Sequence, residues 1–176
     1  MIDERYTYSA TYDKKGSLVG SVSEADLDGD GTIDFRSTYE ATYDKAGRQV
    51  GEVSETDFDG DGVIDSRSTS SASYDKAGRF VGSVFEADSD GDGVIDYRSA
   101  RLRPYDAAGR VVGEEYEYDY GGDGTIDDRS ASTYTYDKEG NSSERCMRRT
   151  LAATARSISD PVTPIPTMRP DAPSEP

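Results

Sequence analysis

Apolar and polar residues alternate in short segments that return every 31 residues along the chain, as the spacing from Tyr12 to Tyr43 shows. In residues 35–43, Tyr39 alternates with polar neighbours, and Thr and Ser are frequent, which is typical of a β-strand. The Asp-Lys-Ala-Gly sequence at 44–47 has the Asp and Gly positions that a type I turn prefers. A second alternating segment follows, so each unit is predicted to be a β-hairpin.

A glycine interrupts the alternation in the second strand of four units. Val50 and Val53 are an odd number of residues apart, so an unbroken strand would point them to opposite faces. The glycine lies between the apolar positions at Gly20, Gly51, Gly82 and Gly113. This pattern predicts a β-bulge that returns both valines to one face. Alternatively, the glycine only permits the close approach of a stacked neighbour.

Together the units predict an all-β fold, an antiparallel β-hairpin array built as a meander or a solenoid-like spiral of about ten strands. The repeats would fill residues 1–145. The predicted units lie near 5–34, 36–65, 67–96, 98–127 and 129–145. Residues 101–104 break the alternation and include Pro104, so an irregular strand is expected there.

The sequence changes character after Gly140. Met147, Leu151 and Ile158 recur at helical spacing among arginines, which favours a short helix over 146–158 that caps the open end of the sheet. Residues 159–176 are rich in proline and predict an extended linker or tail. The unpaired edges of an open sheet would also permit self-association.

The longer loops carry the chemistry, because the pattern DxDGDGxxD returns in phase. It is complete at 26–34, 57–65 and 88–96, and 119–127 repeats it with one change. An EF-hand loop binds calcium through oxygens at positions 1, 3, 5, 7 and 9, with glycine at position 6. The predicted carboxylate ligands are Asp26, Asp28, Asp30 and Asp34; Asp57, Asp59, Asp61 and Asp65; Asp88, Asp90, Asp92 and Asp96; and Asp119, Asp123 and Asp127. The predicted main-chain carbonyl ligands belong to Thr32, Val63, Val94 and Thr125.

About four calcium sites are therefore expected, and the fourth should be weaker because Gly121 replaces its third-position carboxylate. Position 12 is Ser37 rather than the bidentate Glu of a sensor EF-hand, and the flanking segments are predicted strands. The alternative is a set of solvated Asp-Gly turns without metal. Equivalent loops two strands apart would lie about 10 Å from one another, close enough for their carboxylates to repel.

Two charged residues flank every loop. Glu24 precedes the first loop by two residues and Arg36 follows it by two, and the other loops repeat this arrangement. Across a strand pair these side chains would be directly opposite, where unlike charges contribute up to about 1 kcal/mol. We expect an ion pair that closes the base of the loop, while an extra calcium ligand from the Glu is the alternative.

The composition excludes several classes of function. With 36 acidic and 20 basic residues the formal net charge is -16, which repels nucleic acid and anionic lipid. The chain has one cysteine and no histidine, so Cys/His zinc sites, serine triads and cysteine-histidine dyads have no residues here. Residues 28–32 also spell the DxDGT phosphotransferase signature, but no buried hydrophobic strand precedes them. No apolar run is long enough to span a membrane. We therefore expect neither an enzyme nor a membrane-spanning protein.

The YDKAGR turns at 43–48 and 74–79 resemble the YD repeats of bacterial Rhs and teneurin-type proteins, and the acidic loops are similar to thrombospondin type 3 and dockerin calcium repeats. The resemblance covers residues 2–140 and implies a spiralling hairpin sheet on the bacterial surface or outside the cell. It does not extend to a cargo-encapsulating shell, because such shells are far larger and lack a calcium loop in each unit.

Three hypotheses follow for the function. The first is an extracellular, calcium-stabilised structural module, such as a surface stalk, adhesin spacer or filament subunit. The second is a fragment of a larger YD-repeat protein with an enzyme or toxin elsewhere. The third is a glycan-binding module that uses the recurrent tyrosines, although in-register tyrosines on one sheet face are more often core.

Overall fold

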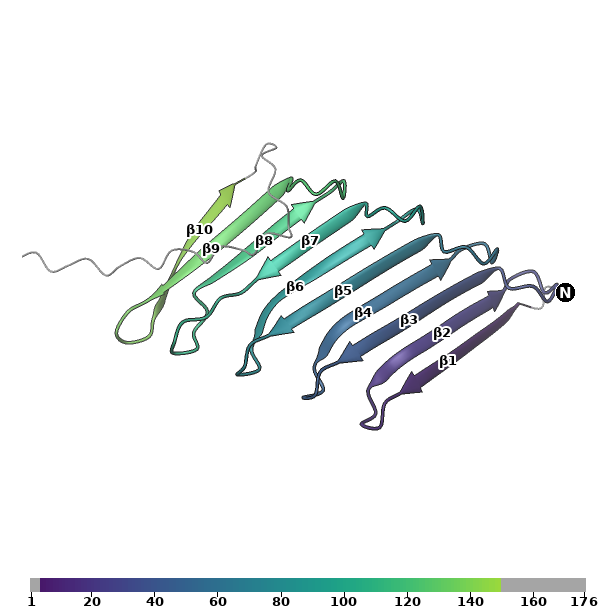
Figure 1. Ribbon diagram of the computed structural model, residues 1–176, viewed down its shortest axis with the longest axis horizontal. Helices are drawn as coiled ribbons and strands as arrows, with labels where there is room; N and C mark the ends of the chain where they lie inside the picture. The colour runs from purple at the N-terminus through teal and green to yellow at the C-terminus, as the bar shows by residue number, and fades with distance from the viewer. Residues whose placement is uncertain (1–3, 150–176) are drawn as a thin grey trace, which may run out of the picture.

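A computed structural model describes residues 4–149, with side chains over residues 4–143. Ten strands form one open sheet, in which each strand pairs antiparallel with its neighbour in sequence (Figure 1). The strands are β1 (Arg5–Tyr12), β2 (Leu18–Asp26), β3 (Phe35–Tyr43), β4 (Gln49–Asp57), β5 (Ser66–Tyr74), β6 (Phe80–Asp88), β7 (Tyr97–Leu102), β8 (Gly113–Asp119), β9 (Asp128–Tyr136) and β10 (Ser142–Arg149). The predicted all-β hairpin meander is confirmed.

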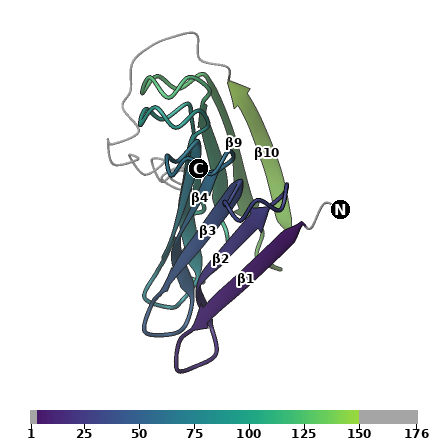
Figure 2. The same ribbon diagram turned by 90° about the vertical axis from the view of Figure 1, so that its right-hand side faces the viewer.

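The two kinds of connection lie at opposite ends of the strands (Figures 1 and 2). The acidic loops join each even-numbered strand to the next odd-numbered one, and we call their side of the sheet the loop edge. The tight turns that close the hairpins form the turn edge. Each edge therefore presents one chemical motif several times in succession.

Strand register separates the side chains of the two faces. Tyr39 is opposite Ser54, and Tyr74 is opposite Phe80, so alternation places the strand aromatics on one side, the aromatic face. The aromatic face carries Tyr6, Tyr8, Tyr12, Phe35, Tyr39, Tyr43, Tyr74, Phe80, Phe85, Tyr97, Tyr116, Tyr118, Tyr134 and Tyr136. Val53 and Val84 belong to the other side.

The sheet has almost no enclosed interior. Ala25, Ala41 and Ile126 are the buried apolar residues in the described part of the chain. From β3 onward the strand tyrosines are half-buried, and those of β1 are exposed. The interpretation of the tyrosines as core is therefore only partly met, because no second layer covers them within residues 4–149.

The β-bulge is present in the first three hairpins. Between β3 and β4, Thr42 pairs with Gly51 and Tyr43 with Gln49, so Val50 is the extra residue. The same shift occurs between β1 and β2 and between β5 and β6. Close approach also occurs, because a Cβ on Gly82 would lie 2.7 Å from the Arg101 carbonyl oxygen of the next strand. The predicted bulge is therefore confirmed at Gly20, Gly51 and Gly82, and close approach holds at Gly82, but no register shift accompanies Gly113 in β8.

The fourth and fifth hairpins depart from this pattern. As expected from residues 101–104, β7 ends at Leu102, and beyond it the pairing is extended by an isolated bridge between Tyr105 and Val111 and by a hydrogen bond from the Val112 amide to the Pro104 carbonyl oxygen. The helix predicted over 146–158 is wrong for residues 146–149, which belong to β10 and pair with β9. The open edge of β9 offers them main-chain partners, and this pairing overrides the helical spacing. Residues 150–158 lie outside the described residues, as do residues 159–176.

Tyrosine hydroxyls join consecutive hairpins at the turn edge. The Tyr43 hydroxyl donates a hydrogen bond to the Leu18 carbonyl oxygen over 2.9 Å. The same bond joins Tyr74 to Gln49, Tyr105 to Phe80 and Tyr136 to Val111. Each tyrosine therefore fixes its own turn to the hairpin before it.

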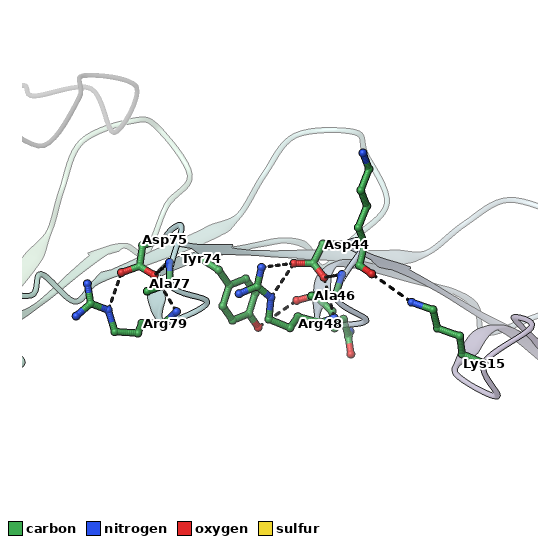
Figure 3. Close-up of polar contacts among 10 residues, drawn as sticks. Lys15, Asp44, Ala46, Arg48, Tyr74, Asp75, Ala77 and Arg79 are labelled. Atoms are coloured by element: carbon green, nitrogen blue, oxygen red, sulfur yellow. Dashed lines mark hydrogen bonds and ion pairs between the residues drawn. The ribbon is translucent and has the colours of Figure 1, made fainter. Parts of the chain in front are cut away.

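Arginines at the same edge contact the hairpin that follows, whereas the tyrosine hydroxyls contact the hairpin before. The guanidinium carbon of Arg48 lies 4.4 Å from the ring centroid of Tyr74 in the next unit, a cation–π contact. Arg79 and Arg110 lie at the same distance over Tyr105 and Tyr136. Figure 3 shows Arg48 beside Tyr74, and also Lys15, whose ammonium group donates to the Lys45 carbonyl oxygen in the first junction.

In the second, third and fourth turns, the aspartate that opens the turn positions the arginine that follows it. Asp44 accepts the main-chain amides of Ala46 and Arg48 through Oδ1, and Arg48 Nε donates to its Oδ2 over 2.7 Å. The Arg48 amide is the largest cause that lowers the pKa of Asp44 below its ordinary 3.8. A lowered folded-state pKa stabilises the fold only while the carboxylate is ionised. The contribution is therefore complete above the ordinary pKa and is lost as the pH falls through the lowered one.

Replacing Tyr43 by Phe should lower the free energy of unfolding by about 1 kcal/mol, because the hydrogen bond to the Leu18 carbonyl is lost. Urea unfolding followed by circular dichroism measures this change. Tyr12→Phe is the matched control, since Tyr12 is 62% exposed and should have almost no effect. Equal destabilisation by both variants would contradict the proposed role of the hydroxyl.

Candidate metal centre

An ion pair closes the base of each acidic loop. Glu24 and Arg36 are directly opposite in β2 and β3, with 3.7 Å between Oε1 and Nε. The equivalent pairs are Glu55 with Arg67, Glu86 with Arg98 and Glu117 with Arg129, at 3.3 to 3.4 Å. The Asp34 amide also donates to the Ala25 carbonyl oxygen over 2.8 Å. The predicted pairing of these charges is confirmed, and it fixes the two ends of the loop together.

The first aspartate of each loop organises the loop backbone. Asp26 is only 3% exposed; its Oδ1 accepts the Gly29 amide over 2.7 Å and its Oδ2 accepts the Gly31 amide over 3.1 Å. Asp57 and Asp88 make the same pair of bonds. Each carboxylate oxygen has two lone pairs, so one bond to an amide still leaves each oxygen able to bind a cation.

The remaining aspartates of the loop bond to neighbouring amides as well. Asp34 Oδ2 accepts the Leu27 amide over 2.7 Å, which closes the loop from its far end. Asp28 and Asp30 are exposed, and Asp30 Oδ1 accepts the Thr32 amide over 2.7 Å. This bond is the main cause that lowers the pKa of Asp30, so its carboxylate is ionised at neutral pH.

Three loops bring three carboxylates together. In each group, one oxygen per residue lies within 4.8 Å of the others. The groups are Asp26, Asp28 and Asp34; Asp57, Asp59 and Asp61; and Asp88, Asp90 and Asp96. Oxygens bound to one calcium ion lie about 2.3–2.6 Å from it, hence no more than about 5 Å apart. These all-oxygen clusters could therefore hold a hard metal ion.

Some predicted ligands lie outside these clusters. Asp30, Asp65 and Asp92 are absent from the three groups, although they belong to the same loops. The carbonyl groups at position 7, in Thr32, Val63, Val94 and Thr125, stay predicted ligands. Their amides donate to the fifth-position aspartates, which places their backbone beside the exposed part of each loop.

The fourth loop differs from the others, as its sequence predicts. Asp119, Asp123 and Asp127 form no cluster of three within the described residues. Asp119 is 1% exposed and still accepts the Gly124 amide over 2.8 Å, so the loop keeps the same backbone organisation. Gly121 leaves the third position without a carboxylate. The backbone organisation of the loop is therefore retained while the number of loop carboxylates is reduced.

Sequence reasoning missed how closely the loops approach one another. It predicted a separation of about 10 Å, but a Cβ on Gly60 would overlap the Ile33 carbonyl of the preceding loop. Gly91 and Gly122 have the same relation to Ile64 and Ile95. The sequence does contain a signal of this contact, because every loop has a glycine at position 4. An EF-hand requires glycine at position 6, so the glycine at position 4 needs a different explanation.

Comparisons with known proteins assign no family to this arrangement. No family model matches the chain, and no curated protein matches it in sequence. Within residues 4–149, no helix is long and apolar enough to cross a membrane.

In the absence of metal, Asp57→Ala should destabilise the protein by about 1–3 kcal/mol, because two loop amides lose a buried acceptor. Asp59→Ala should change stability by less than about 0.5 kcal/mol, because Asp59 is exposed. Urea unfolding in EDTA compares the two variants. If Asp59→Ala were as destabilising as Asp57→Ala, the structural role of the first aspartate would be wrong.

Proposed function

We propose that this protein is a calcium-stabilised structural repeat module that acts outside the cell. The observation that carries the proposal is the in-phase succession of three carboxylate clusters along one edge of a sheet with almost no enclosed interior. Such a sheet gains little from hydrophobic burial. Ions bound along the loop edge would supply the missing stabilisation.

Calcium fits the donor set better than other common ions. Carboxylate and carbonyl oxygens are its preferred ligands, and the clusters contain no sulfur or nitrogen donor. Magnesium requires a smaller, near-octahedral shell and keeps most of its waters. Three complete sites and a weaker fourth site are the expected stoichiometry.

The energy available from calcium suits an extracellular location. Extracellular calcium loops bind with Kd values of about 10⁻⁴ to 10⁻³ M, which millimolar calcium saturates and cytosolic calcium does not. At about tenfold over Kd, each site that binds only the folded chain contributes about 1.4 kcal/mol, and four contribute about 5 to 6 kcal/mol. This sum is comparable with the whole stability of a small domain.

An elongated array of this kind suits a surface stalk, an adhesin spacer or a filament subunit. The likeness to YD repeats and to extracellular calcium repeats supports the same class of function. The likeness also leaves open that the chain is part of a larger YD-repeat protein with an enzyme or toxin elsewhere.

The aromatic face favours glycan binding as a second candidate function. Its tyrosines are half-buried rather than enclosed, and small residues such as Ser68 and Ser70 lie between them. Sugar rings stack on surfaces that combine exposed aromatic rings with hydroxyl groups. Saturable binding of a glycan would distinguish this function from that of a pure spacer.

Calcium should raise the melting temperature and the β-sheet signal of the protein in a titration followed by circular dichroism, and EDTA should reverse both changes. Magnesium should substitute poorly. The triple variant Asp28→Ala, Asp59→Ala and Asp90→Ala should lose most of the response, because each carboxylate cluster loses one of its three members. An unchanged melting temperature at saturating calcium would overturn the proposal.

A further inference from the structure

Consecutive acidic loops touch one another along the whole loop edge. In loops two, three and four, the fourth-position glycine adopts a left-handed φ of 73°, 70° and 61°. A Cβ at each of these glycines would overlap the carbonyl oxygen of Ile33, Ile64 or Ile95 in the preceding loop. Movement of one loop is therefore transmitted directly to the backbone of the next.

A second contact occurs at only two of the three junctions. Phe58 in the second loop lies against Phe35, which directly follows the first loop, with 6.3 Å between ring centroids. Tyr120 in the fourth loop lies against Tyr97, which directly follows the third loop, with 6.1 Å between centroids. We call these two pairs the interloop aromatic contacts.

The junction between the second and third loops lacks this contact. The equivalent positions there are Ser66 and Ser89. Both positions carry serine at this junction, whereas both carry an aromatic residue at the other two junctions. The aromatic residues therefore occur as complete pairs or not at all. Packed aromatic rings contribute about 0.5–1.5 kcal/mol beyond their buried area. The loop edge is therefore divided into a first pair of loops and a second pair.

We propose that the four loops bind calcium as two coupled pairs, loops one and two and loops three and four. This inference rests on the calcium-binding function proposed above. An ion that orders one loop also orders its partner through the shared contact. Binding of the second ion therefore costs less conformational entropy. Coupling across the serine junction is weaker, because this junction lacks the aromatic pair and has only the glycine contact and a 3.4 Å hydrogen bond from the Ser66 hydroxyl to the Asp88 carbonyl oxygen.

The pairing gives the incomplete fourth loop a partner. Tyr120 is stacked on Tyr118 and also contacts Tyr97, so the fourth loop is joined to the third by its side chain and its backbone. Filling the complete third loop should raise the affinity of the fourth. Typical coupling free energies correspond to a change in affinity of about 5-fold to 150-fold.

The first experiment breaks the aromatic contact and then creates a new one. Calcium binding to the whole chain is measured by calorimetric titration, and the Hill coefficient is the readout. Phe58→Ser should lower the Hill coefficient, and it should leave folding intact because Phe58 is 61% exposed. The double variant Ser66→Phe with Ser89→Phe should raise the Hill coefficient, because it joins the two pairs.

The second experiment uses two glycines of one loop as a matched pair. Gly60 and Gly62 both have left-handed φ values, so alanine at either position causes comparable backbone strain. Only Gly60→Ala forces the loop away from Ile33, since a Cβ on Gly62 meets nothing within 4 Å. Gly60→Ala should lower the Hill coefficient more than Gly62→Ala does.

The outcomes separate this inference from the proposed function. Calcium binding with the same Hill coefficient in the wild type, Phe58→Ser and the double serine variant would overturn the pairing and leave the calcium sites standing. No calcium binding by the wild type would overturn the proposed function, and the pairing with it. A Hill coefficient that falls in Phe58→Ser and rises in the double variant would support the pairing.

Discussion

The absence of an enclosed interior is the constraint on which the rest of the structure depends. A single-layer sheet leaves both faces open, and the buried apolar residues within residues 4–149 are Ala25, Ala41 and Ile126. Hydrophobic burial normally supplies most of the stability of a domain. Here the hairpins must instead be held together by main-chain pairing and by contacts between neighbouring units along the two edges.

The two edges meet this requirement through different interactions. At the turn edge, aspartates and arginines of the same turn pair with each other, as when Asp44 holds Arg48 over the ring of Tyr74. The contacts of that edge need no added ion. At the loop edge, carboxylates such as Asp57, Asp59 and Asp61 converge without an arginine among them, in a chain of net charge -16. These clusters could hold a cation, and the proposed function therefore places the response to calcium at this edge.

Much of this arrangement could be predicted because each unit repeats the same local signals. The alternation of Tyr39 and Ala41, the glycine beside Val50 and the Asp-Gly turn each predict local structure from short-range rules, and the structure contains the strands, the bulge and the hairpin. The opposition of Glu24 and Arg36 follows from counting outward from the loop. Because the units repeat at a fixed spacing, these features recur at equivalent positions of successive units.

The features that the sequence did not predict depend on contacts between units. The approach of Gly60 to Ile33 requires the curvature of successive loops, which no local rule gives. The strand at 146–149 forms because β9 offers an open edge, a long-range cause that competes with helical spacing. The half-exposed state of the tyrosines depends on whether a second layer is present, and alternation along one strand contains no information about that.

Hydrogen–deuterium exchange of the intact chain, in calcium and in EDTA at equal ionic strength, tests the central claim most directly. The account predicts that calcium slows exchange first at the loop amides of Gly31, Gly62 and Gly93, and then across the central strands β4 and β5. The turn-edge amides should respond least. Equal protection of the loop amides in calcium and in EDTA would contradict the claim that bound cations hold the loop edge together.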